Sequence, residues 1–160
     1  MKFVDAHWNM GLALEEAEAA FRADEVPVGA VIIGANGHVL ARAHNLKEHS
    51  KDPCDHAEIS AIRKAAQELD SWRLAGATLI VTLEPCPMCL AAMVQARIEA
   101  LVFGAYDPKG GSLSLGYNLY NDTRLNHRFD VMGGVRHYEA AKLLSQFFRE
   151  KRKGYKLTNS

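Results

Sequence analysis

The sequence of 160 residues is long enough for one domain with a substantial hydrophobic core. Apolar residues make up 48% and charged residues 24%, which is the balance of a soluble globular protein. The 19 acidic and 19 basic residues cancel, so net charge neither favours nor excludes a polyanionic partner. No apolar run approaches the roughly 18 residues of a membrane span, and the N-terminus lacks an apolar signal-peptide core. We therefore expect one cytoplasmic domain over residues 1–160, with no membrane partner.

The N-terminal half predicts a helix, a β-hairpin and a second helix. In chain order these are a helix over 5–24, strands over 26–34 and 38–43, a polar loop over 44–54 and a helix over 56–69. The two strands are joined by Asn36-Gly37, which is a strong signal for a tight hairpin turn. In the second helix, Ile59, Ile62 and Ala66 recur at spacings of three and four, which indicates one apolar face.

The C-terminal half predicts strands that alternate with helices. In chain order these are a strand over 77–83, a helix over 86–98, a strand over 100–105, a loop over 106–126, a short strand over 129–135 and a helix over 137–152. Pro87 suits the first turn of its helix. A loop as long as 106–126 is more often functional than idle in a compact domain. We expect the basic tail, about 151–160, to fray.

This order of elements predicts an α/β fold. Strands that alternate with helices form a sheet with helices on both faces. We therefore expect a three-layer α/β/α architecture around a mixed central sheet of about five strands. The connection from 77–83 to 100–105 is expected to be a parallel, right-handed crossover.

The cysteines point to metal binding or catalysis, because disulfides are rare in a reducing compartment. By itself, Cys86-x-x-Cys89 fits a redox motif, half of a structural zinc site, or two small buried residues. However, it lies where a central strand ends and a helix begins, which is where ligand sites form in α/β sheets. The helix N-terminus there stabilises a thiolate, the form that binds metal.

A histidine at the start of another helix completes a zinc ligand set. His56 could join Cys86 and Cys89 around one zinc ion, leaving a fourth position open. Cys54 is the alternative fourth ligand of a closed structural site, and is otherwise expected to be small and half-buried. In an open site the fourth position would hold water, whose pKa zinc lowers from 15.7 to roughly 7.

Glu58 has two interpretations. In the first it forms a capping box with Asp55, because an acidic or hydroxyl residue followed three positions later by Glu is a common helix start. In the second it lies beside the metal without binding it, and moves a proton from water to a leaving group. The presence of the zinc-ligand pattern favours the second interpretation, with Glu58 as the catalytic residue.

The pattern H-x-E followed by P-C-x-x-C is the signature of zinc nucleobase deaminases. From about Trp8 to Lys151 the sequence resembles the bacterial tRNA-specific adenosine deaminases, which have a cytidine deaminase-like fold. The segments that carry the resemblance are EVPVGAV (25–31), HAE (56–58), TLEPCPMC (82–89), VFGAYDPKGG (102–111), LNHRF (125–129) and FFREKR (147–152). The chain departs from the family's usual pattern at Asp55, where a small apolar residue is usual, and in the loop 112–118.

The resemblance implies a zinc-dependent homodimer that hydrolyses the wobble adenosine of a tRNA anticodon to inosine. It assigns substrate contacts to Asn45, Val28, Ala57, Pro85 and Asp107, and RNA contacts to Arg149, Lys151, Arg152 and Lys153. By this resemblance Asn45 holds the target ribose and Val28 lines the base pocket.

Most of these residues also have a purely structural interpretation. Asn45 could cap a turn, Val28 fits a core strand, and Asp107-Pro108 is a good turn opening. The four basic residues near position 150 could form a solvated helix end. Glu84, next to the cysteines, is expected to form hydrogen bonds that support the site.

Three functional hypotheses follow. The first is an RNA adenosine deaminase, which the basic C-terminal cluster and LNHRF favour. The second is a zinc deaminase of free bases or nucleosides of the guanine, cytosine or adenine type. The third is a non-catalytic domain stabilised by zinc. An open coordination position and Glu58 beside it argue against the third hypothesis.

Overall fold

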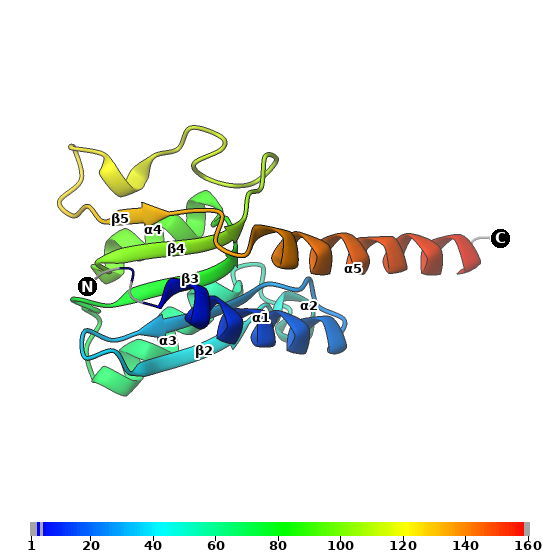
Figure 1. Cartoon of the computed structure of the whole chain (residues 1–160), viewed down its shortest axis with the longest axis horizontal. Coiled ribbons are helices and arrows are strands. Elements are labelled where there is room, and N and C mark those ends of the chain that lie inside the picture. The colour runs from blue at the N-terminus through cyan, green and yellow to red at the C-terminus, as the bar shows by residue number, and fades with distance from the viewer. Residues whose placement is uncertain (1–2, 4, 159–160) are drawn as a thin grey trace.

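The computed structural model, which describes Phe3 and residues 5–158, has one mixed sheet with helices on both faces (Figure 1). The strand order is β2 (Val39–His44), β1 (Gly29–Ile33), β3 (Thr78–Leu83), β4 (Ala100–Ala105) and β5 (Asp130–Met132). Strand β1 is antiparallel to β2 and β3, whereas β3, β4 and β5 are mutually parallel. The predicted mixed five-stranded sheet and its parallel crossover are confirmed.

Two hydrophobic cores lie on opposite faces of the sheet. Helices α1 (Ala6–Arg22) and α5 (His137–Thr158) cover one face, and α3 (Ala57–Leu69) and α4 (Pro87–Ala96) cover the other. Successive residues of a strand point to opposite faces, so Ile80 packs toward the first pair of helices and Leu79 toward the second. Because both faces are covered, β3 and β4 are apolar along nearly their whole length.

The hairpin and the helix starts follow the local sequence. The turn between β1 and β2 has Gly37 at φ 85°, and the Gly37 N–H donates to the Gly34 carbonyl at 2.9 Å. Glycine adopts this left-handed conformation without strain. Pro87 occupies the first turn of α4, as predicted, where its missing N–H costs nothing.

The structure departs from the predicted elements at four places, because tertiary contacts override local patterns. Strand β1 begins at Gly29 rather than 26, since the Val28 N–H bonds locally to the Val26 carbonyl. The polar loop 44–54 contains a short helix, α2 (Lys47–Ser50), and the loop 106–126 contains a 3-10 turn at Leu119–Asn121. Strand β5 covers only Asp130–Met132 of the predicted 129–135.

Helix α5 continues to Thr158, so the expectation of a frayed tail is wrong for 151–158, and its last two positions, 159 and 160, lie outside the described residues. Arg, Glu and Lys are good helix formers, and they fill the segment after Phe148. At the end of the helix, the Thr158 hydroxyl donates to the carbonyls of Gly154 and Tyr155. As a result, the basic half of α5 extends beyond the edge of the sheet (Figure 1).

The carboxyl ends of β3 and β4 lie at the edge of the sheet from which α5 extends (Figure 1). The chain after β3 leads directly into α4, so that the N-terminus of this helix lies at the same edge. The topology thereby predisposes this edge to hold a ligand. None of the helices in the described chain is long and apolar enough to cross a membrane.

Candidate active site

The structure brings His56, Cys86 and Cys89 together at the carboxyl edge of the sheet. His56 is the N-cap of α3 and Cys86 is the N-cap of α4, with Cys89 one turn further along. The His56 Nδ1 atom lies 3.6 Å from the Cys86 Sγ atom and 3.5 Å from the Cys89 Sγ atom. All three ligand atoms lie within 4.8 Å of one another, so this group could hold a metal ion.

The spacing of these atoms fits zinc. With Zn–S near 2.3 Å and Zn–N near 2.0–2.1 Å, tetrahedral zinc places its sulfur and nitrogen ligands about 3.6 Å apart. The hydrogen bond from Cys89 lowers the pKa of Cys86 to about 4, and a further hydrogen bond from His56 acts in the same direction. One of the two sulfurs is therefore already favoured as a thiolate, which is the metal-binding form.

Cys54 does not join this group. It is exposed and lies outside the metal-ligating cluster. Its backbone N–H donates to Asp52 Oδ1 at 2.9 Å in a local turn. The expectation that Cys54 is half-buried is therefore wrong, because this turn lies at the surface.

Glu58 is a buried carboxyl in the first turn of α3, with only 4% of its surface exposed. The capping-box interpretation is wrong, since the N-cap is His56 rather than Asp55 and no side chain caps the helix. Burial raises the pKa of Glu58, because it disfavours the charged form, while the Cys89 thiol and His56 act in the opposite direction. A carboxyl in such surroundings keeps a proton more readily than an exposed one, which suits a group that has to carry protons between reactants.

A cavity of ≈ 210 Å³ opens beside His56, Cys86 and Glu58. Four of the five predicted substrate contacts line it, namely Asn45, Val28, Ala57 and Asp107. Pro85 is not among the lining residues; it is buried, and its carbonyl accepts the Ser112 N–H at 2.8 Å. The other lining residues are Val26, Lys47, Leu83, Glu84 and Gly110.

Asn45 and Asp107 both stabilise turns and line the cavity. Asn45 Oδ1 accepts the Lys47 N–H at 3.2 Å, and its amide donates to the Val26 carbonyl at 3.4 Å. Asp107 Oδ1 accepts the N–H groups of Lys109 and Gly110. The interpretation that both residues stabilise turns is thus confirmed. The same turns bring the two side chains to the wall of the cavity.

Two buried carboxylates hold the loops on either side of the cavity. Glu84 accepts the Asp107 N–H together with the N–H and hydroxyl of Ser114, as expected for a supporting residue. Glu25 was missed by sequence reasoning. It is 1% exposed and accepts the N–H groups of Glu48 and His49 as well as a bond with the His49 ring. The sequence signal that could have identified it is an acidic residue directly before an apolar segment.

The basic cluster near position 150 lies apart from the metal-ligating group, on exposed turns of α5. Lys151 is paired with Asp24 at 2.6 Å, and both side chains are at least half exposed. Arg149 and Lys153 line a surface hollow of ≈ 310 Å³ with Lys142. The structure therefore leaves Arg149, Arg152 and Lys153 without an ion pair within the described chain, but not Lys151.

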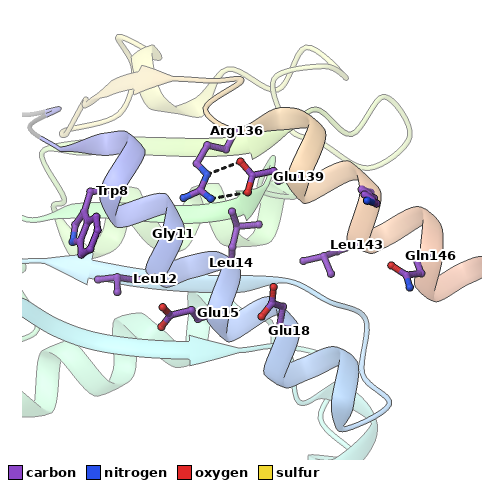
Figure 2. A pocket seen from close by; sticks show the side chains of 11 residues that line it. Trp8, Gly11, Leu12, Leu14, Glu15, Glu18, Arg136, Glu139, Leu143 and Gln146 are labelled. Atoms are coloured by element: carbon purple, nitrogen blue, oxygen red, sulfur yellow. Dashed lines mark hydrogen bonds and ion pairs between the residues drawn. The ribbon is translucent and has the colours of Figure 1, made fainter.

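A second cavity, of ≈ 550 Å³, lies between α1 and α5 (Figure 2). Trp8 stands at one end of it, and Arg136 forms a two-pronged ion pair with Glu139. Its described lining includes no His or Cys side chain. It therefore offers no imidazole or thiolate ligand for a metal ion.

Comparisons with known proteins agree with this site. Residues 4–152 match the family described as MafB19-like deaminase. The chain is 50% identical over 141 residues to the tRNA-specific adenosine deaminase of Bacillus subtilis, covering 88% of this chain and 87% of that protein. It is 48% identical over 143 residues to the same enzyme of Agrobacterium fabrum, covering 89% and 93%.

A solved structure from work on A-to-I editing by tRNA:A34 deaminases at the wobble position superposes with a TM-score of 0.80. It is 46% identical, and the match covers 84% of this chain and 97% of that one. The fold and the His, Cys, Cys and Glu constellation thus define a deaminase of the cytidine deaminase-like class. Within that class, the chain belongs to the family of the tRNA-specific adenosine deaminases.

Proposed function

We propose that this protein hydrolyses adenosine to inosine in RNA, at the wobble position of a tRNA anticodon, with one zinc ion held by His56, Cys86 and Cys89. The observation that carries the proposal is the buried Glu58 beside a three-residue ligand group with zinc spacing. The substrate named for the relatives at 48–50% identity supports the choice of adenosine in tRNA.

The reaction exchanges the C6 amino group of adenine for oxygen and consumes one water. A zinc ion in such a site supplies Lewis acidity, which activates water for attack at neutral pH. Glu58 accepts a proton from the attacking water and delivers a proton to the departing amine, which leaves as ammonia. Its burial prevents bulk water from competing for those protons.

The cavity limits what can reach Glu58. A volume of ≈ 210 Å³ lies below the roughly 300–1,000 Å³ of pockets for drug-sized ligands, so it suits one base rather than a whole nucleotide. An adenine in RNA must therefore leave its stack to enter. Val28 and Ala57 supply apolar walls, and Asn45 and Asp107 supply polar groups at the sides.

The exposed cations of α5 supply the contacts to flanking RNA. Arg149, Arg152 and Lys153 lie on the face of α5 opposite the buried Ala140 and Phe147. The half of α5 that carries these cations extends past the carboxyl edge of the sheet (Figure 1), which is the edge where His56 and Cys86 lie at the starts of α3 and α4. Phosphates are the groups that such a surface binds.

We also propose that the protein is a cytoplasmic homodimer, as the resemblance implies. Half-buried apolar side chains on the outer side of α3 and α4 support a dimer, because a second copy would cover them. They are Ile59, Ile62, Ala66, Met88, Ala91 and Ala92. Light scattering of the purified protein tests this, and a monomer at all concentrations would contradict it.

The experiment that tests the proposed reaction uses a panel of substrates. The purified protein is incubated with an anticodon stem-loop carrying adenosine at the wobble position, and in parallel with free adenosine, cytosine and guanine. Mass spectrometry of the products is expected to show inosine in the stem-loop alone. Conversion of a free base without conversion of the RNA would instead establish a free-base deaminase.

A further inference from the structure

Helix α2 depends on Glu25 for its position. It has four residues, Lys47–Ser50, which is too short to be stable by itself. The Glu25 carboxylate accepts the Glu48 N–H at 2.9 Å, the His49 N–H at 2.8 Å and a bond from His49 Nδ1 at 2.6 Å. One buried side chain therefore fixes the segment that carries Asn45 and Lys47 into the wall of the cavity.

Lys47 is a charged residue of this segment to which the fold gives no structural role. It is exposed and yet lines the cavity, and its side chain has no ion pair within the described chain. The other charged residues known to line the cavity, apart from His56, are acidic, namely Glu58, Glu84 and Asp107. Glu84 and Asp107 accept hydrogen bonds from backbone N–H groups, so neither carboxylate needs Lys47 as a partner. The Lys47 ammonium group is therefore available to an incoming ligand.

A cation at the cavity mouth is useful for a polynucleotide and not for a free base. A nucleotide within RNA brings backbone phosphates to the mouth when its base enters the cavity. We propose that Lys47 binds a backbone phosphate next to the target nucleotide, and that Glu25 is a positioning residue that holds Lys47 there. This proposal rests on the proposed function, since it requires an RNA substrate.

The test measures KM, kcat and the salt dependence of RNA binding for Lys47→Gln, Glu25→Gln and the double variant, with the wobble-adenosine stem-loop as substrate. Lys51→Gln is the matched control, because Lys51 is an exposed lysine four positions away that does not line the cavity. Zinc content is measured for every variant.

For Lys47→Gln we expect a KM about fivefold higher at 0.1 M salt and a salt slope shallower by about 0.7, which is the contribution of one single-strand phosphate contact. The kcat and zinc content are expected to match the parent. Glu25→Gln is expected to raise KM in the same way. The double variant is expected to have a KM close to that of either single variant, because both substitutions remove the same phosphate contact. Lys51→Gln is expected to leave all parameters unchanged.

If Glu25→Gln does not fold, His49→Ala replaces it in the test, because it removes only the side-chain bond of the three bonds to Glu25. We expect His49→Ala to raise KM less than Lys47→Gln does. A parent-like KM and salt slope for Lys47→Gln would overturn the phosphate contact. Fully additive effects of Glu25→Gln and Lys47→Gln would overturn the positioning role. A parent that converts free bases but no RNA would instead refute the proposed function, which separates the two failures.

Discussion

The Nδ1 atom of His56 lies 3.5 Å from the Sγ atom of Cys89, although 33 positions separate the two residues in the chain. The distance is short because α3 and α4 pack side by side on one face of the sheet, with their N-termini at the same edge. Each helix start contributes ligand atoms, so two local sequence signals converge on one point.

This convergence predicts one zinc ion per chain. Cys86→Ser and Cys89→Ser are each expected to lower the zinc content of the purified protein strongly, because an open three-ligand site loses a third of its donors. Cys54→Ser is the control and is expected to retain zinc, since Cys54 lies outside the cluster. Elemental analysis gives the metal content, and full occupancy in Cys86→Ser would exclude this ligand set.

The exposed cations of α5 predict how RNA binding responds to salt. Replacing Arg149, Arg152 and Lys153 with Ala is expected to flatten the salt slope by about 0.7 for each phosphate contact that is lost. Lys151→Ala alone is expected to change the slope less, because Lys151 is paired with Asp24. Binding titrations over a series of salt concentrations measure both. A triple variant with the parent's slope would remove α5 from the RNA-binding surface.

Glu25 predicts a specific pH dependence of stability. Burial by itself would raise its pKa, but the hydrogen bonds from Glu48 and His49 and the charge of His49 bring the pKa below the ordinary 4.5. A carboxyl whose folded pKa is depressed stabilises the protein above its unfolded pKa, and this contribution disappears as pH falls through the folded pKa. The free energy of unfolding of the parent should therefore exceed that of Glu25→Gln above about pH 5, with the difference shrinking below it.

Urea unfolding of the parent and Glu25→Gln between neutral and acidic pH measures this difference. Glu150→Gln provides a control, because Glu150 is exposed on α5 and has no ion pair within the described chain. A difference between parent and Glu25→Gln that stays constant with pH would show that the Glu25 charge is not what holds α2.

The close packing of α1 against β1 at Gly29 predicts that a larger side chain there destabilises the protein. A Cβ at this position would collide with the Ala13 carbonyl and lie 2.5 Å from the Ala17 backbone nitrogen. Gly29→Ala is therefore expected to lower the free energy of unfolding by about 1–3 kcal/mol, the usual range for overpacking. Gly154→Ala, where a Cβ would meet nothing within 4 Å, is the matched control and is not expected to lower it. Equal stability of the two variants would contradict the close packing at Gly29.

The sequence predicted the metal-ligating group and Glu58 because both depend on local signals. His56 and Glu58 share one helix start, and Cys86 and Cys89 share another, so only the approach of the two helices had to come from the fold. Four of the five predicted substrate residues line the cavity, and three of them, Val28, Ala57 and Asp107, lie in the segments that carry the family resemblance.

The features that sequence reasoning missed depend on contacts between distant segments. Helix α2 has no periodic pattern of its own and forms on the carboxylate of Glu25, more than 20 positions earlier. The pairing of Lys151 with Asp24 joins residues 127 positions apart, so no local pattern distinguishes Lys151 from its neighbours. Pro85 does not line the cavity, because adjacency to Cys86 in the chain does not decide which way a residue faces, and its contact with substrate stays a prediction.

The most direct measurement is inosine formation in a wobble-adenosine stem-loop by the parent and by Glu58→Gln at equal zinc content. The Gln side chain keeps the shape of Glu58 but cannot move protons, so we expect zinc and fold to be retained. The rate is expected to fall by roughly 10²-fold to 10⁴-fold, the usual contribution of a general acid–base group. A Glu58→Gln variant that retains its zinc and forms inosine at the parent's rate would contradict the role of Glu58, and a parent that forms no inosine would contradict the proposed reaction.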